Sequence, residues 1–283
     1  MRIDAHQHFW RYSPTEYGWI TDELLAIGRD FLPEDLHPLL TGIGFDGCIA
    51  VQARQSLEET RWLLELAEGN SFIRGVVGWV DLCLKDLGSA ELRGQLERFS
   101  GDSRLVGVRH VVHDERDDAF MLREDFRRGI GLLKEFDLTY DLLLFPRHLP
   151  IAVRLVEEFP EQPFVLDHLA KPFIARGEIS PWREDFHALA KLPNVMCKLS
   201  GMMTEANWNA WRREDFRPYL DVALEAFGAD RLMIGSDWPV CTLSAEYAVA
   251  MQIVMEYVGQ LSDDEQAAIL GKNCARFYGV AES

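Results

Sequence analysis

The sequence has little positive charge. Its 283 residues carry 29 lysines and arginines against 46 aspartates and glutamates, which gives a formal net charge of −17 at pH 7. No run rich in lysine or arginine interrupts this balance, so the chain lacks the basic surface through which proteins bind a nucleic acid backbone or an anionic membrane. Nucleic acids and membranes are therefore excluded as its main partners.

Long hydrophobic runs and paired cysteines are also missing. No run approaches the ~18 apolar residues of a membrane-spanning helix, and residues 1–6 contain no apolar stretch typical of a secretory signal. The cysteines never occur as C-x-x-C and are predicted to be reduced, buried and inert, with a thiol nucleophile as the alternative. They are Cys48, Cys83, Cys197, Cys241 and Cys274. We expect a cytoplasmic protein.

Short apolar runs alternate with helical patterns along the whole chain. Eight of these runs are predicted strands, and each is almost continuously apolar, which is typical of parallel strands covered on both faces. They span residues 2–5, 47–51, 75–80, 106–110, 140–145, 164–167, 195–199 and 232–235. Capping boxes, Ser56 with Glu59 and Ser262 with Glu265, predict the starts of two helices, the second running to about residue 276.

This alternation favours an α/β fold with one (β/α)8 barrel. Eight units of about 35 residues each fit a single distorted TIM-like barrel with an extra C-terminal helix better than two doubly wound halves. No linker or change of composition divides the chain, so one domain is expected over residues 1–283. The glycine-rich dinucleotide fingerprint and the P-loop are absent, so we expect no nucleotide cofactor. Catalytic residues of such a barrel lie at the carboxyl ends of the strands.

Three predicted strands end in residues that can bind a metal or transfer protons. After the first, His6 and His8 project to one side of an extended chain and can bind one divalent ion, although an H-x-H pair also occurs on ordinary surfaces. After the sixth, His168 can supply a third imidazole. After the eighth, Asp237 can hold a metal, orient water and take its proton, or instead cap a turn.

Two further charged residues flank His168. Asp167 can anchor a metal-binding side chain, or it can simply cap the loop that follows the strand. Lys171 can polarise a carbonyl group, or it can be a solvated loop lysine. The sequence leaves both alternatives open for each residue.

These segments together resemble the amidohydrolase superfamily. The matching motifs are Asp-x-His-x-His at residues 4–8, Asp-His at 167–168 and Gly-Ser-Asp-Trp-Pro at 235–239, and residues 51–54, 197–201 and 273–279 resemble its amidohydrolase-2 type of sugar lactonase. The resemblance covers essentially the whole chain. It implies a barrel that hydrolyses an aldonolactone similar to L-fuconolactone, with four residues at metal and catalytic positions: His6, His8, His168 and Asp237.

The resemblance also implies how the reaction would proceed. Asp237 would activate water, while the histidines bind a metal that polarises the carbonyl or donate hydrogen bonds to it. Two-metal members of the superfamily carry a bridging lysine and a histidine on middle strands, and the predicted strand at residues 140–145 has neither. The chain is therefore expected to hold at most one divalent ion such as zinc, and activity without a metal stays open.

Side chains at the other strand ends are predicted to bind the hydroxyl and carboxylate groups of a sugar acid. They are Gln52, Arg54, Trp79, Arg109, His110, Lys171 and Lys198. Trp238 is predicted to lie near the substrate, where its ring can stack on a sugar, and Arg109 has a structural ion pair as its alternative. Other histidines in helical or loop contexts, including His113, are expected outside the site.

Two other functions remain open at this stage. A zinc-dependent decarboxylase or an amide hydrolase of the same superfamily would use similar ligands, because a fold does not determine a reaction. A barrel that binds a sugar acid without turnover is the other alternative, but it has no need for a base beside an imidazole cluster. The sequence is compatible with a homo-oligomer.

Overall fold

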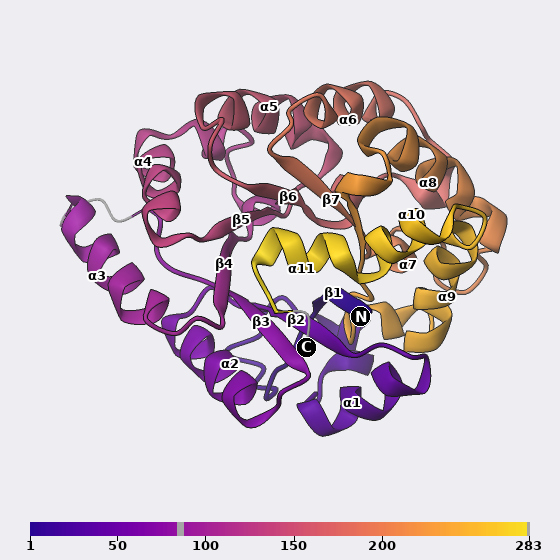
Figure 1. Ribbon diagram of the computed structural model, residues 1–283, viewed down its shortest axis with the longest axis horizontal. Coiled ribbons are helices and arrows are strands. Elements are labelled where there is room, and N and C mark those ends of the chain that lie inside the picture. Colours follow the sequence, from indigo (N-terminus) through magenta and orange to yellow (C-terminus); the bar gives the residue numbers. More distant parts are fainter. Residues whose placement is uncertain (84–87, 282–283) are drawn as a thin grey trace.

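Eight parallel strands form one sheet that curls into a barrel (Figure 1). The computed structural model describes residues 1–83 and 88–281. The strands follow chain order around the barrel: β1 (Ile3–Gln7), β2 (Gly47–Val51), β3 (Ile73–Gly78), β4 (Leu105–His110), β5 (Thr139–Leu142), β6 (Phe164–Leu166), β7 (Val195–Leu199) and β8 (Leu232–Ile234). A parallel bridge between Gln7 and Trp238 brings the end of β8 to β1. The predicted barrel is confirmed, and all eight predicted strands are present.

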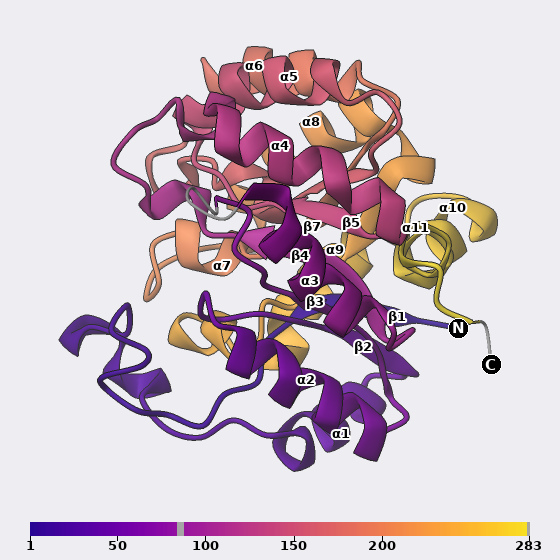
Figure 2. The same cartoon turned by 90° about the vertical axis from the view of Figure 1, so that its left-hand side faces the viewer.

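Helices cover the outside of this sheet (Figures 1 and 2). They are α1 (Pro33–Gly42), α2 (Leu57–Gly69), α3 (Gly88–Ser100), α4 (Glu124–Leu133), α5 (Leu149–Glu158), α6 (Trp182–Ala190), α8 (Arg213–Phe227) and α9 (Tyr247–Val258). The short α7 (Met202–Glu205) follows β7. In Figure 2, α7 lies at the opposite end of the barrel from the C-terminal helices, so the loops that follow the strands surround one open end.

The predicted helix starts are partly correct. Ser56 caps α2 by accepting hydrogen bonds from the backbone N–H groups of Glu58 and Glu59. The Glu59 side chain, however, does not complete the capping box, because it turns inward and accepts hydrogen bonds from the backbone N–H groups of Ala53 and Arg54. A buried carboxylate thus organises the loop after β2, where the sequence predicted only a helix start.

The C-terminal helix differs from the prediction in its continuity. The Ser262 capping box is present, but the helix that it starts is divided into α10 (Asp263–Ala267), a π-helical turn (Ala268–Lys272) and α11 (Asn273–Tyr278). Asn273 begins α11, and its side chain donates hydrogen bonds to the backbone carbonyls of Ala229 and Leu232 at 2.7 Å each. These bonds attach α11 to the start of β8.

The amino-terminal end of the barrel is closed by α11, which crosses the centre of Figure 1. Inward-pointing apolar side chains from the strands pack there against Cys274, Ala275 and Tyr278. A larger apolar cluster fills the space between the strands and the outer helices. The interior next to α11 is therefore mostly apolar, apart from the buried Asp141, which accepts a hydrogen bond from the Tyr278 hydroxyl.

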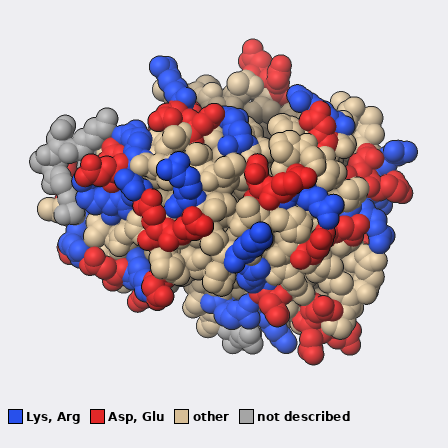
Figure 3. Space-filling model, turned by 90° about the horizontal axis from the view of Figure 1, so that it is seen from above, with Lys and Arg blue, Asp and Glu red and all other residues tan. Residues whose placement is uncertain are grey.

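The cysteines are free, as the sequence predicted. All five cysteines are free, four are buried and Cys83 is half-buried, and burial raises the pKa of the Cys48 and Cys241 thiols well above the ordinary value. In the face shown in Figure 3, acidic and basic side chains are interspersed. Among the described residues, no helix combines the length and the apolar character needed to cross a membrane.

Candidate active site

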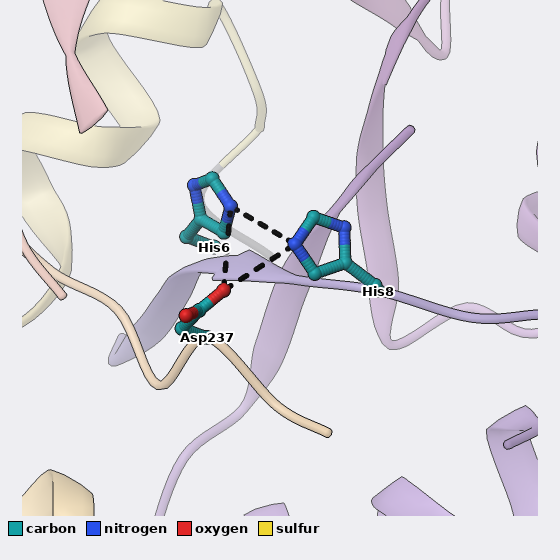
Figure 4. Close-up of side chains that lie close together, drawn as sticks. All are labelled: His6, His8 and Asp237. Carbon is teal, nitrogen blue, oxygen red and sulfur yellow. Dashed lines mark hydrogen bonds and ion pairs between the residues drawn. The ribbon is translucent and has the colours of Figure 1, made fainter. Parts of the chain in front are cut away.

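Three side chains from the first and last strands meet at the carboxyl end of the barrel (Figure 4). His6 belongs to β1, His8 follows it directly, and Asp237 follows β8. The Nε2 atoms of the two histidines are 3.2 Å apart, and Asp237 Oδ1 lies 3.4 Å from His8 Nε2 and 3.9 Å from His6 Nε2. All three are at most 5% exposed. Because β1 and β8 are neighbours in the closed barrel, residues from both ends of the sequence share one cluster.

His168 joins this cluster from the loop after β6. Its Nε2 lies 3.7 Å from Asp237 Oδ1, and its Nδ1 lies 2.8 Å from the hydroxyl of Ser200. Residues 168–171 all have positive φ angles between 53° and 57°, a left-handed turn that costs roughly 1–2 kcal/mol per residue outside glycine. Surrounding contacts must hold such a turn in place, and strain of this kind is concentrated at functional sites.

The pKa shifts in the cluster follow from burial and from neighbouring side chains. His8 Nδ1 lies 2.7 Å from the backbone carbonyl of Val51, which can only accept, so Nδ1 carries a proton. Burial lowers the pKa of His6 and of His168 well below the ordinary value. Burial also raises the pKa of Asp237, but the neighbouring His168 and His8 outweigh it and the net pKa is lowered. The His6 and His168 rings therefore favour the neutral form, and the Asp237 side chain favours the ionised form.

The donor set fits one divalent cation. Tetrahedral zinc with bonds of about 2.0–2.1 Å to nitrogen requires ligand atoms roughly 3.3–3.5 Å apart, and the separations within the cluster are 3.2 to 3.9 Å. His6, His8 and Asp237 form one group that can hold a metal, and His6, Asp167 and His168 form another. His6 is common to both groups, with Nε2 toward His8 and Asp237 and Nδ1 toward Asp167. The two Nε2 atoms in contact there are suited to a shared cation.

A second set of charges surrounds His6 on its other side. Asp167 Oδ1 lies 3.2 Å from His6 Nδ1, and Asp167 Oδ2 accepts a hydrogen bond of 3.1 Å from Arg109 Nη1. The same Nη1 lies 3.3 Å from His6 Nε2, and Arg109 Nη2 donates a hydrogen bond to the backbone carbonyl of Gln52. Arg109 is only 3% exposed, so it makes the structural ion pair considered above and still lies against the cluster.

The remaining predicted substrate residues divide into two groups. Gln52, Trp79 and His110 each have a buried side-chain atom with no hydrogen-bond partner among the described residues: Gln52 Oε1, Trp79 Nε1 and His110 Nδ1. His110 is also held by Glu115, 2.7 Å from its Nε2, and stacks on Phe120. Buried polar atoms without partners are costly, so these atoms are suited to receiving a polar ligand.

The second group is engaged by other side chains. Arg54 forms an ion pair of 2.8 Å with Glu16, and Lys171 forms one of 3.0 Å with Glu205. Lys198 is fully buried, and its ammonium is paired with Asp141 and Asp167.

Trp238 packs in an aromatic cluster. It is 2% exposed, with edge-on contacts to Phe9 and Phe31. In place of stacking on a sugar, we expect its indole to support Asp237, the preceding residue.

Some residues of this region were not anticipated. His113, expected outside the site, stacks on Phe145 and has a buried Nδ1 with no partner in the described part of the chain. Burial, then Lys171 and Arg109, lower its pKa to about 3, so it is a neutral ring beside these two cations. Asp141 in β5 is fully buried, and a charged residue within a predicted apolar strand was the available signal for it.

A histidine and aspartate cluster at the strand ends of a (β/α)8 barrel defines the class of protein. The chain belongs to the amidohydrolase family, because the sequence model of that family, described as Amidohydrolase, matches residues 3–280. This confirms the resemblance inferred from the motifs.

The relatives of the chain are similar over nearly its full length. A protein of Burkholderia multivorans named L-fucono-1,5-lactonase is 42% identical, with 100% of this chain and 97% of that protein covered. One of the same name from Burkholderia ambifaria is 37% identical, with 99% and 96% covered. A crystal structure of a Burkholderia multivorans amidohydrolase with bound zinc has a TM-score of 0.94 at 42% identity, covering 99% of this chain and 100% of that one.

Proposed function

We propose that the chain hydrolyses the ring ester of a sugar lactone, with L-fucono-1,5-lactone or a close aldonolactone as its substrate. The observation that carries this proposal is the position of Asp237, whose Oδ1 lies 3.9, 3.4 and 3.7 Å from the Nε2 atoms of His6, His8 and His168. The two relatives of 42% and 37% identity are named for this reaction. The chain would accordingly be a carboxylic ester hydrolase whose product is the free sugar acid.

Asp237 is proposed as the base. Its lowered pKa keeps it ionised near neutral pH, and a base must be deprotonated to accept the proton of an attacking water. The water oxygen bonds to the lactone carbonyl carbon while Asp237 takes the proton. The bond between that carbon and the ring oxygen then breaks, and Asp237 returns the proton to the departing ring oxygen. Water is thereby added across the ring ester, because its hydroxyl group joins the new carboxyl group and its other proton joins the freed hydroxyl of the same sugar acid.

Two features stabilise the negative charge that develops on the carbonyl oxygen. Arg109 brings a permanent positive charge to within 3.3 Å of His6 Nε2, and a fixed charge in a buried site stabilises an oxyanion more strongly than one in water. His6, His8, His168 and Asp237 would hold a zinc ion, which polarises the carbonyl as a Lewis acid when bound.

Recognition of the sugar is proposed for the polar atoms without partners. Trp79 Nε1 can donate, Gln52 Oε1 and His110 Nδ1 can accept, and His113 Nδ1 can do either, so the set matches hydroxyl groups that both donate and accept. A site with buried polar groups discriminates strongly against ligands that leave them unpaired. We therefore expect hydroxylated lactones to be preferred over unsubstituted rings.

The direct test is hydrolysis of a panel of aldonolactones by the purified protein and by Asp237→Asn. The variant retains the size of the side chain but not the base, so we expect kcat to fall by well over tenfold, which is more than ~1.4 kcal/mol in the barrier. Asp221→Asn, at a surface carboxylate bonded to Tyr257, serves as the matched control. If folded Asp237→Asn retains more than about a tenth of the activity, Asp237 is not the base.

The same panel separates the alternative functions. Aromatic carboxylic acids tested alongside the lactones would release CO2 if the chain were a decarboxylase, and that result would replace the proposed reaction. Saturable binding of a lactone without hydrolysis over hours would identify a binding barrel instead. Acid release from lactones alone supports the proposal.

A further inference from the structure

A chain of buried polar contacts leads from His6 toward the far end of the barrel. Lys198 lies in β7, and its Nζ contacts Asp141 Oδ2 at 2.5 Å and Asp167 Oδ1 at 3.0 Å. Its ammonium is also 3.2 Å from His6 Nδ1. The side chains of Lys198, Asp141 and Asp167 are all 0% exposed. The ammonium therefore lies between two carboxylates in the interior of the barrel.

The C-terminal helix supplies the last member of this chain. The hydroxyl of Tyr278, in α11, contacts Asp141 Oδ2 at 2.8 Å and Oδ1 at 3.1 Å. Its ring lies 5.5 Å from Lys198 Nζ, at its face. Because α11 closes the amino-terminal end of the barrel (Figure 1), these contacts connect that end to the cluster at the opposite end.

Both ring nitrogens of His6 face a donor. Arg109 Nη1 lies 3.3 Å from Nε2, and Lys198 Nζ lies 3.2 Å from Nδ1, and both a guanidinium and an ammonium can only donate. Asp167 Oδ1 lies 3.2 Å from the same Nδ1. Lys198 therefore contacts the His6 ring and the Asp167 carboxylate beside it at the same time.

We propose that Lys198, Asp141 and Tyr278 are positioning residues that hold Asp167, and through it the His6 ring, in the geometry needed for catalysis. Lys198 holds Oδ1 of Asp167 while Arg109 holds Oδ2, so the carboxylate cannot rotate. Tyr278 and Lys198 together satisfy Asp141. The activity measurements below rest on the proposed lactonase function, whereas the spectroscopic measurement does not.

Tyr278→Phe tests the end of the chain farthest from the reaction. The ring stays in place and one hydroxyl is lost, so the fold should persist. We expect kcat to fall several-fold, toward the ~10-fold loss typical of partners behind catalytic ligands, with KM within about twofold of wild type. Tyr257→Phe is the matched control, because it removes a tyrosine hydroxyl that donates to Asp221 at 2.8 Å on the outside of the barrel. Equal kcat values for the two variants would overturn the proposal.

The double variant Lys198→Met/Asp141→Leu removes the buried ion pair as a unit. Replacing both charges avoids leaving one of them unpaired, which a single substitution would do. We expect kcat to fall by at least ~10-fold with KM nearly unchanged. A rise in KM with kcat retained would instead show that Lys198 binds substrate, and the positioning role would be wrong.

A spectroscopic measurement tests the same contact independently of turnover. In metal-free protein, the ring N–H proton of the buried His6 should give a low-field NMR resonance that is absent in His6→Asn. We expect this resonance to shift or broaden in Tyr278→Phe and in the double variant, and to stay in place in Tyr257→Phe. An unchanged resonance in Tyr278→Phe would overturn the proposal, even if the double variant failed to fold. If wild-type protein hydrolyses no lactone, the proposed function fails while this measurement still decides the positioning role.

Discussion

Replacing Gly201 with alanine tests whether the position of His168 sets the rate. Gly201 follows β7 with a φ of +63°, and an added Cβ would lie 2.4 Å from His168 Nδ1 and 2.5 Å from its Cγ. Gly177 has the same φ of +63°, but a Cβ added there would meet nothing within 4 Å. The two substitutions therefore impose the same backbone strain, and only one of them displaces a ring of the candidate site.

The size of the effect follows from these distances. Ordinary van der Waals contact begins near 3.4 Å, so the His168 ring must move by about 1 Å, and a displacement of that size can reduce a rate by about 100-fold. The movement would disturb both the 2.8 Å contact with Ser200 and the 3.7 Å approach to Asp237. The left-handed backbone costs each alanine variant about 1 kcal/mol in folding free energy.

The assay compares steady-state lactone hydrolysis and thermal unfolding for both variants. Gly177→Ala should lower the melting temperature slightly and leave kcat near the wild-type value. Gly201→Ala should lower kcat by about two orders of magnitude, or about 3 kcal/mol in the barrier. If Gly201→Ala is as active as Gly177→Ala, the position of the His168 ring does not limit the reaction, and its proposed part in the site is wrong.

Three further outcomes are expected. Zinc should raise the melting temperature of chelated wild-type protein in a concentration-dependent way but not that of His8→Ala, because only a folded ligand set binds it; equal shifts would place the metal elsewhere. Burial raises the pKa of Glu59 to about 7, so between about pH 4.5 and 7 the folded protein keeps a proton that the unfolded chain releases. The free energy of unfolding of the wild type should therefore fall by at most about 3 kcal/mol over this pH range. Glu59→Gln should flatten this dependence on pH. Asn273→Ala leaves the carbonyls of Ala229 and Leu232 without their donor and should cost about 1–3 kcal/mol in denaturant unfolding, with kcat unchanged if α11 keeps its position.

Local sequence patterns could place some residues of the candidate site but not the direction of others. His6 and His8 could be placed together from a spacing of two residues in one strand, and Asp237 and His168 from their positions directly after apolar runs. Lys198 could be assigned to a strand end in the same way, but its direction could not. Its side chain contacts Asp141 and Asp167 inside the barrel, because the closed sheet brings three strands around it.

Other contacts depend on residues far apart in the chain. The partners Tyr278 and Asp141 are separated by 137 residues, and nothing in the composition of α11 distinguishes a tyrosine that enters the barrel from one on its surface. Glu59 followed a pattern typical of a capping box, yet its carboxylate turns to the loop after β2 because the buried N–H groups of Ala53 and Arg54 need an acceptor. Local preference was outweighed in this case by the need to satisfy buried polar groups.

The sequence by itself determined the barrel, since hydrophobic periodicity and the order of strands and helices are local properties of the chain. It also determined which residues stand at the strand ends. Only the tertiary structure decided which of these side chains meet and that Tyr278 of α11 contacts Asp141 in the interior. Those properties depend on distances and burial between residues separated by much of the chain, and a closed barrel establishes them only when all eight strands are in place.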